Sequence, residues 1–309
     1  MTFIKVLAKM MPLSTSAPSP ATPEPETGPL VSVILPTHNR YRWLPRAVDS
    51  VLGQTYAPLE LIVVDDGSTD GTSDLLKTYG SDIRVIRQEN MGVSGARNAG
   101  IRAARGGLMA LLDSDDKWLP EKLVHQVDYF RATPGAMICQ TEEIWIRGGK
   151  RVNPKNRHRK FSGMIFEKTL PLCLISPSAV MMRASLLQEV GLFDERLPAC
   201  EDYDLWLRIT WKYPVHLISK PLVVKNGGHP DQLSAMPELD KYRIQSLVKI
   251  LTKNCLSASQ RAAALATLAA KCSVYAGGCR KRGRLDQAAY YERLPGTMEA
   301  SPGDDIPTP

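Results

Sequence analysis

The sequence predicts an α/β protein in which a mostly parallel β-sheet is flanked by helices and followed by a C-terminal helical extension. Two observations lead to this fold class. Short apolar runs alternate with stretches of helical periodicity over residues 30–112, which is typical of a parallel sheet with crossover helices. Beyond residue 239 the apolar residues recur at helical spacing.

Four short apolar runs are the predicted strands of the parallel sheet. Continuous runs of this length suit strands that are buried on both faces. They are VSVIL at 31–35, LIVV at 61–64, IRVI at 83–86 and LMALL at 108–112. The stretches between them predict helices over 43–52, 68–79 and 94–105. Ligands bind beyond the carboxyl ends of the strands in such sheets, so we look for a site in the residues that follow each run.

The remainder of the chain mixes strands and helices. IWIRGGKRVN at 144–153 predicts a hairpin on a two-glycine turn, 178–183 and 215–219 are expected to be extended, and 204–210 helical. These elements suggest four regions. We expect a disordered Pro-rich leader at 1–29, a main α/β domain at 30–238, a helical extension at 239–294 and a disordered tail at 295–309.

Charge, hydropathy and cysteine spacing limit the functional classes that fit this sequence. The formal net charge of +7 suits a polyanionic partner, whether nucleic acid, anionic lipid or a phosphorylated small molecule, and selects none of them. No apolar run approaches the roughly 18 residues of a membrane span. The six cysteines lack the spacing of zinc or redox motifs and are expected to be reduced thiols.

The strongest functional signal is the acidic sequence after two of the predicted strands. Asp113 and Asp115 follow the fourth strand, and alternation places their side chains on the same side. A hard divalent cation, which shares its remaining positions with phosphates, would offset two such carboxylates. The alternative is an acidic turn that precedes the next helix. Asp65 and Asp66 follow the second strand, where a carboxylate can accept from a nucleobase N–H or a ribose hydroxyl.

Two further segments carry candidate residues. Arg97 lies near the start of a predicted helix and could bind a diphosphate, although the small residues around it equally suit close helix–sheet packing. In EDYDLWLR, helical spacing places Asp202 on the same face as apolar residues. Glu201 shares its face with Asp204 and Arg208, which we expect to be solvated. Asp202 is therefore the better candidate for a general base.

Taken together, these segments resemble the family 2 inverting glycosyltransferases, whose GT-A fold has a Rossmann-like, mostly parallel sheet. The similarity runs from about Val31 to His229. It rests on several motifs in the same order, and the acidic pair after the fourth strand corresponds to the DXD motif. The motifs are PTHNR, ELIVVDDGSTDGT, ENMGVSGARNAGI, ALLDSDDKWLPEKL, GLFDE and CEDYDLWLR.

The resemblance implies a donor site for a nucleotide-diphosphate sugar. Asp66 would contact the nucleotide base in a pocket lined by Pro36 and Thr37. Asn39 and Arg40 belong to the same PTHNR motif and are expected to lie at the donor as well.

The resemblance also implies the reacting groups. Asp113 would face the ribose, Arg97 the diphosphate, and Asp115 would ligate the Mg²⁺ or Mn²⁺ that bridges the diphosphate. His229 is expected to be either a second metal ligand or an ordinary loop histidine. Asp202 would deprotonate the acceptor hydroxyl, so that the sugar is transferred with inversion in one displacement.

Other functions agree less well with the sequence. A nucleotide-sugar-binding module without catalysis would share the motifs, and a nucleotidyltransferase would need a triphosphate loop that the sequence lacks. The basic stretch at 150–160 has few aromatic residues, so we expect no nucleic-acid partner and interpret it first as a solvated loop. Contact with an anionic acceptor or a membrane surface is the second interpretation.

Partners and location follow from the resemblance. The donor is expected to be a nucleotide sugar, and the acceptor a saccharide, a lipid-linked compound or a protein. We expect a cytoplasmic enzyme of cell envelope polysaccharide or other glycoconjugate synthesis, with peripheral contact to the inner face of the membrane as an alternative location.

Overall fold

The computed structural model describes residues 28–229 and 232–300. Its centre is a mixed sheet with the strand order β3-β2-β1-β4-β8-β6-β9-β5, in which β7 pairs only with β6. The strands are β1 (Val31–Thr37), β2 (Leu59–Asp66), β3 (Arg84–Gln88), β4 (Leu108–Leu111), β5 (Lys117–Trp118), β6 (Ile138–Arg147), β7 (Lys150–Val152), β8 (Val180–Arg183) and β9 (His216–Gly227). The leader predicted at 1–29 lies outside the described residues except for its last two.

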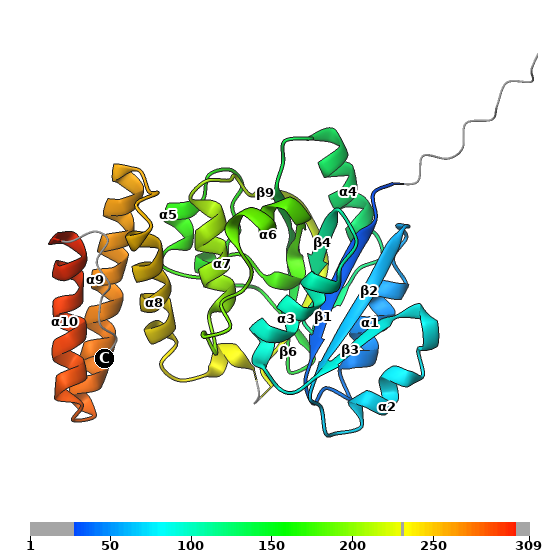
Figure 1. The fold of residues 1–309 in the computed structure, drawn as a ribbon, viewed down its shortest axis with the longest axis horizontal. Coiled ribbons are helices and arrows are strands. Elements are labelled where there is room, and N and C mark those ends of the chain that lie inside the picture. The colour runs from blue at the N-terminus through cyan, green and yellow to red at the C-terminus, as the bar shows by residue number, and fades with distance from the viewer. Residues whose placement is uncertain (1–27, 230–231, 301–309) are drawn as a thin grey trace, which may run out of the picture.

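Helices cover both faces of the sheet, and three more form one end of the molecule (Figure 1). They are α1 (Leu44–Leu52), α2 (Thr72–Lys77), α3 (Gly92–Ala103), α4 (Lys122–Ala132), α5 (Phe166–Thr169), α6 (Ala184–Val190), α7 (Glu201–Thr210), α8 (Leu239–Thr252), α9 (Ala258–Lys281) and α10 (Leu285–Ala300). The apolar sides of α1 and α4 pack on one face, and α3, α6 and α7 pack on the other. The predicted α/β fold with a helical extension is therefore confirmed.

The first four strands are parallel, as their apolar runs predict. β1 pairs with β2 and with β4, and β2 pairs with β3, all in parallel. The prediction that all four strands are buried on both faces is wrong for β3. This strand is at the edge of the sheet, and its Val85 is 43% exposed. An edge strand has a neighbour on only one side, so an apolar run as short as IRVI does not by itself indicate burial.

The second half of the sheet is mixed and brings distant segments together. β8 is antiparallel to both β4 and β6, and β9 is parallel to β6 and antiparallel to β5. The predicted hairpin is formed by β6 and β7 around Gly148 and Gly149, both of which have positive φ. The pairing of β6 with β9 carries the segment before His229 to the side of the acidic strand ends.

Helix α3 crosses the sheet closely at Gly100, where a larger residue would not fit. A Cβ atom there would lie 2.5 Å from Ile34 Cγ2 of β1. We expect Gly100→Ala to lower the free energy of unfolding by about 1–3 kcal/mol because the packed core must shift to accept a methyl group. The matched control is Gly277→Ala in α9, where a Cβ meets no atom within 4 Å. Alanine favours a helix by about 1 kcal/mol over glycine, so this variant should be at least as stable as the wild type. Urea unfolding of both variants tests this, and a loss of stability at Gly277 as large as that at Gly100 would contradict it.

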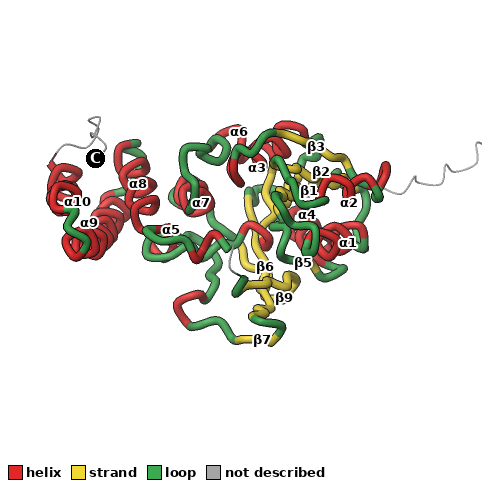
Figure 2. Tube along the Cα trace, turned by 90° about the horizontal axis from the view of Figure 1, so that it is seen from below, coloured by secondary structure: helices red, strands yellow, loops and turns green. Residues whose placement is uncertain are grey.

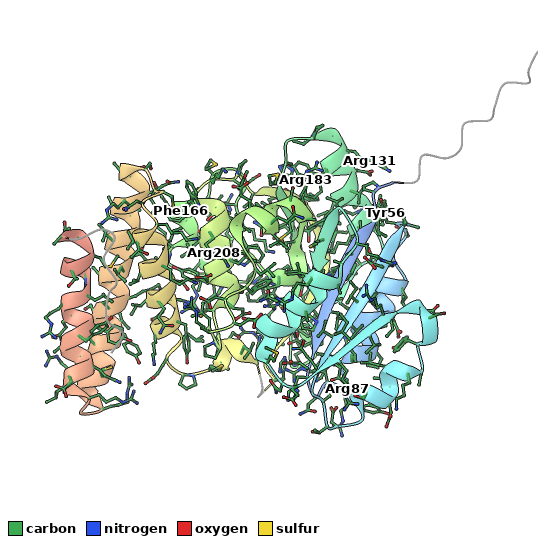
Figure 3. The ribbon with its side chains drawn as sticks, in the orientation of Figure 1. Tyr56, Arg87, Arg131, Phe166, Arg183 and Arg208 are labelled. Carbon is green, nitrogen blue, oxygen red and sulfur yellow. The ribbon has the colours of Figure 1, made fainter. Side chains whose placement is uncertain are left out.

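The C-terminal helices share a core with the main domain. Side chains from α8, α9 and α10 pack with Phe166 of α5 and with Tyr203 and Leu207 of α7. Figure 3 labels Phe166, and also Arg208 of α7, between the sheet and these helices. The tail predicted from residue 295 is wrong in its first six residues, because α10 continues through Pro295 to Ala300. Burial of Leu294 and Met298 in the shared core accounts for the longer helix. Residues 301–309 lie outside the described part.

Helix α9 is long and apolar enough to cross a membrane, judged by length and composition alone. This differs from the expectation that no apolar run of the sequence approaches the length of a membrane span. In the fold it lies between α8 and α10 (Figure 1), and one side, including Leu268 and Cys272, is buried in the shared core. Its start is fixed by a capping box in which the Ser257 side chain accepts from the Gln260 backbone N–H.

Candidate active site

A cavity of about 990 Å³ opens at the carboxyl ends of β1, β2 and β4. Its volume is at the upper end of the range found for small-molecule sites. All ten residues that the sequence predicts for a site line this cavity. They are Pro36, Thr37, Asn39, Arg40, Asp66, Arg97, Asp113, Asp115, Asp202 and His229. The topology explains why these residues lie around one cavity. The carboxyl ends of the parallel strands meet at one edge of the sheet, and β9 and α7 close the other sides of the cavity.

Asp66 and Asp65 end β2 and point in different directions. Asp66 Oδ1 accepts hydrogen bonds from Gln88 Nε2 at 2.8 Å and from the Met91 N–H at 2.9 Å, which hold the carboxylate at the cavity. Asp65 instead accepts from the N–H of Ser68 and from the hydroxyl of Ser73. Asp66 therefore lies at the cavity, whereas Asp65 fixes the loop before α2.

The PTHNR segment forms the adjoining wall. Thr37 is 3% exposed, and its hydroxyl has no hydrogen-bond partner within the described residues. Asn39 adopts positive φ, and its backbone and side chain bond to Ser68 and Thr69 respectively. The Arg40 N–H donates to Thr72. Asn39 and Arg40 thus join the loops that follow β1 and β2, and Thr37 contributes an unsatisfied hydroxyl to the cavity wall.

Arg97 lies between two carboxylates. Its Nη2 donates to Asp113 Oδ1 at 2.7 Å, its Nη1 donates to Glu201 Oε1 at 2.5 Å, and the residue is only 3% exposed. Burial acts to lower the pKa of Arg97, but Asp113 and Glu201 raise it further above its ordinary value. The guanidinium is therefore fully charged, and both of its terminal nitrogens are already engaged. This geometry makes Arg97 a group that holds Asp113 and Glu201 in place, rather than a free cation.

Asp115 and His229 form the candidate metal-binding pair. Asp115 Oδ2 and His229 Nε2 are 2.7 Å apart, although 114 positions separate them in the chain. Asn226 of β9 fixes the loop by donating to the Asp115 carbonyl at 2.8 Å. Carboxylate oxygen suits Mg²⁺ and Mn²⁺, and imidazole nitrogen is a ligand of first-row transition metals. Among residues 28–229 and 232–300, no group of three or more such side chains could hold a metal. A cation here would therefore complete its shell with phosphate oxygens and water, as Mg²⁺ commonly does.

A buried polar cluster behind this pair was not predicted from the sequence. Asp116 accepts from the Ser178 hydroxyl at 2.7 Å and from the Asn226 N–H at 2.9 Å, and burial raises its pKa well above the ordinary value. Lys225 of β9 lines the cavity and donates to Ser176 at 3.0 Å. Its pKa is raised: burial opposes the rise, but the carboxylates of Glu143 and Asp116 outweigh it.

Asp202 lies in the first turn of α7 and is half-buried at the cavity. Its Oδ2 is 3.4 Å from Cys173 Sγ, which donates to it, and its Oδ1 accepts from the Tyr203 N–H at 2.6 Å. Burial raises the pKa of the Cys173 thiol well above its ordinary value, and Asp202 raises it further. Cys173 therefore stays a thiol and a hydrogen-bond donor to the carboxylate. All six cysteines of the chain are free.

The prediction that Glu201, Asp204 and Arg208 are solvated is wrong, because all three are buried. Arg208 Nε donates to Asp204 Oδ2 at 2.9 Å, and its other nitrogens donate to backbone carbonyls at 190–192. Lys249 of α8 donates to Asp204 Oδ1 at 2.5 Å. Helix α7 is thus covered on both sides, and its charged face pairs with α8 and the loop after α6. Helical spacing alone showed one apolar stripe and gave no sign of this second interface.

Comparison with known proteins finds a family model and relatives that match the sequence of this chain. Residues 32–191 match the model of glycosyl transferase family 2. An uncharacterized glycosyltransferase of Rickettsia prowazekii is 32% identical over 234 residues, which cover 73% of each chain. A second, from Rickettsia felis, is 32% identical over 216 residues, and the match spans only 35% of that longer protein.

Two solved structures share the fold. Staphylococcus aureus TarS residues 1–349, solved in complex with UDP-GlcNAc, aligns with a TM-score of 0.66 at 19% identity over 86% of this chain and 79% of that one. The mannosyltransferase PcManGT from Pyrobaculum calidifontis, solved in complex with GDP-Man and Mn²⁺, aligns with a TM-score of 0.53 at 20% identity over 92% of this chain and 91% of that one.

Proposed function

This chain belongs to glycosyl transferase family 2, and from that premise we propose that it transfers a sugar from a nucleotide-diphosphate donor to an acceptor hydroxyl with inversion. The observation that carries the proposal is that Asp66, Asp113, Asp115 and Asp202 line one cavity, although 136 positions separate the first from the last. The solved structures of TarS and PcManGT, which hold UDP-GlcNAc and GDP-Man, support a nucleotide-sugar donor.

We assign the donor side of the cavity to the ends of β1, β2 and β4. Asp66 accepts from the nucleobase, Pro36 and Thr37 line the base pocket, and Asp113 faces the ribose. The unpartnered hydroxyl of Thr37 supports this assignment, because a bound ligand would satisfy it. Asn39 and Arg40 keep the two loops of the donor pocket joined.

Asp115 and His229 are the residues that would hold a divalent cation, Mg²⁺ or Mn²⁺, together with the donor diphosphate. When bound, such a cation supplies positive charge against the charge that develops on the departing diphosphate. PcManGT was solved with Mn²⁺, which supports the assignment.

Asp202 is the proposed general base. It takes the proton from the acceptor hydroxyl, whose oxygen forms a bond to the anomeric carbon as the bond from that carbon to the diphosphate oxygen breaks. The nucleoside diphosphate leaves with the bonding electron pair. The Cys173 thiol donates a hydrogen bond to one Asp202 oxygen, and the Tyr203 N–H donates to the other, so the carboxylate is fixed at the start of α7.

The cellular setting belongs to the same proposal. We place the enzyme in the cytoplasm, in synthesis of a cell envelope polysaccharide or another glycoconjugate, with peripheral contact to the membrane as the alternative location. Six free thiols suit a reducing compartment.

A panel of UDP- and GDP-sugars, assayed with Mn²⁺ and with Mg²⁺, tests the proposed function. We expect slow release of nucleoside diphosphate from one donor in the presence of a divalent cation, and none after chelation with EDTA. Folded protein that releases no nucleotide from any donor of the panel, with either metal, would contradict the proposal.

Asp115→Asn is expected to lower the metal-dependent rate of nucleotide release by at least about 10- to 100-fold, because one of the two protein ligands is weakened. Titration with Mn²⁺ should show a higher metal concentration at half-maximal rate. Asp74→Asn is the matched control, since this carboxylate is exposed on α2 and does not line the cavity. An unchanged Mn²⁺ titration for Asp115→Asn would remove this residue from the metal site.

A further inference from the structure

The segment 147–160, here called the basic arm, concentrates positive charge to an unusual degree. Its fourteen residues include seven Lys and Arg and no Asp or Glu. In the rest of the chain, Lys and Arg equal Asp and Glu in number, so the arm accounts for the whole net charge of +7. Figure 2 shows that the hairpin strand β7 and the loop after it project from the body of the molecule.

Most of the arm's cations form no ion pair within residues 28–229 and 232–300. Lys160 is the exception, because it is buried and pairs with Glu143 at 3.1 Å. Six others are exposed and form no ion pair within the described residues, namely Arg147, Lys150, Arg151, Lys155, Arg157 and Arg159. His158 lies among them, and its pKa is lowered by burial and then by Arg157, Arg147 and other nearby cations. The local potential is therefore positive.

The base of the arm belongs to the active-site cavity. Arg147, Arg157 and His158 line the same cavity as Asp115 and Asp202. In the sheet, Arg147 of β6 pairs with Gly227 of β9, two residues before His229. A chain that passes along the arm would therefore reach the proposed metal ligand and the proposed base without leaving the surface.

We propose that the acceptor is a polyanionic chain, a glycan or polyol that carries phosphate or carboxylate groups, and that the basic arm binds it with its reactive hydroxyl at Asp202. This inference rests on the proposed function, because it names the acceptor class for the same cavity. Exposed guanidinium and ammonium groups without internal partners bind phosphate and carboxylate groups, and their positive charge also speeds the approach of a polyanionic chain.

Other polyanionic surfaces fit the arm less well. None of the large apolar side chains that are exposed in the described residues lies within 147–160, so the arm offers no group to insert into a bilayer. Its only aromatic side chain is His158, whereas proteins that bind single-stranded nucleic acid stack successive bases on aromatic rings.

The test compares two variants with the same change of charge. The arm variant combines Lys150→Gln, Arg151→Gln and Lys155→Gln, none of which lines the cavity. The control variant combines Lys253→Gln, Lys281→Gln and Arg293→Gln, which are exposed on the C-terminal helices or just after them. The probes are a decamer of galacturonic acid and its methyl ester, which differ in charge but not in the sugar backbone. Binding is measured by calorimetry at about 0.1 M salt.

We expect the wild type and the control variant to bind the acidic decamer with equal Kd, and the arm variant to bind it about tenfold more weakly. Binding of the methyl ester should be weak and equal for all three proteins. Equal weakening in both variants, or no weakening in the arm variant, would overturn the proposal. Arm-dependent binding that is tighter to vesicles of phosphatidylglycerol and phosphatidylcholine, or to a twenty-nucleotide oligouridine, would overturn it in favour of that partner.

Donor hydrolysis separates this inference from the proposed function. The arm variant should release nucleotide from the donor in the absence of acceptor at the wild-type rate, because its donor-side residues are intact. If wild-type protein hydrolyses no donor and still binds the acidic decamer through the arm, the proposed function fails while the binding surface stands. If donor hydrolysis is present and decamer binding is independent of the arm, the proposed function stands and this inference fails.

Discussion

Asp202→Asn is expected to lower sugar transfer by about 10²- to 10⁴-fold, the usual contribution of a positioned general base, and to leave donor affinity close to that of the wild type. The amide has nearly the shape of the carboxylate but cannot take a proton from the acceptor hydroxyl. Calorimetry with the donor and single-turnover release of nucleoside diphosphate separate the two effects. Asp286→Asn is the matched control, because Asp286 is exposed at the same position in the first turn of α10.

Two outcomes would contradict the role of Asp202. Wild-type turnover in Asp202→Asn would mean that this carboxylate is not the base. Loss of donor affinity with an unchanged transfer rate at saturation would place Asp202 at the donor instead. A protein that only binds nucleotide sugars would show wild-type donor affinity and no transfer before or after the substitution, so the variant also tests the non-catalytic alternative.

Arg97→Met is expected to destabilise the folded protein by about 3–5 kcal/mol. Removing one member of a buried ion pair leaves the partner charge in a poorly solvated position, and here two carboxylates, Asp113 and Glu201, lose their partner. Urea unfolding measures the effect. The control is Arg102→Met on the same helix, where the arginine side chain is 57% exposed and 3.8 Å from Glu195, and where a change within about 1 kcal/mol is expected.

The loss in Arg97→Met should grow as pH rises. Burial raises the pKa of Glu201 to about 7 in the wild type, even though Arg97 acts to lower it. Without Arg97 this pKa rises further, so the folded variant keeps the proton on Glu201 above about pH 7, where the folded wild type has released it. The unfolded state, with a pKa near 4.5, has lost the proton in both proteins, so stability falls with pH up to about 7 in the wild type and continues to fall above 7 only in the variant. A stability difference from the wild type that stays constant from about pH 6 to pH 9 would contradict the explanation based on Glu201.

The fold was predictable where local pattern and tertiary environment agree. The runs at 31–35, 61–64 and 108–112 form central strands because their continuous apolar character matches burial on two faces. The run at 83–86 has the same local pattern and lies at an edge, since the position of a strand in a sheet is decided by its neighbours. The extent of α10 was missed for a similar reason: Pro295 and Gly296 suggest an end, but buried packing of Met298 continues the helix.

The candidate site was predictable because most of its carboxylates follow strands of a parallel sheet, and ligands bind beyond the carboxyl ends of such strands. The remaining carboxylate, Asp202, begins a helix whose apolar spacing indicates its inward face. Lys225 and Cys173 escaped prediction, since a lysine inside an apolar strand or an isolated cysteine has no spacing that marks it. Asp116 directly follows Asp115 in the acidic run, and the sequence does not show that it is the buried member. The proximity of Asp115 and His229 comes from the pairing of β6 with β9, which no local pattern contains. The charged face of α7 was misjudged because its partner, Lys249, is 45 residues away from Asp204.

Helix α7 carries Asp202 on the cavity side and is held from behind by α8, through Lys249 and through the core around Tyr203 and Leu207. A minimal enzyme therefore cannot be trimmed to the region of family motifs. Ending the chain at residue 238 would keep every proposed ligand-binding residue and yet expose the back of the helix that carries the proposed base. Any shortened version intended for assay should extend to Ala300.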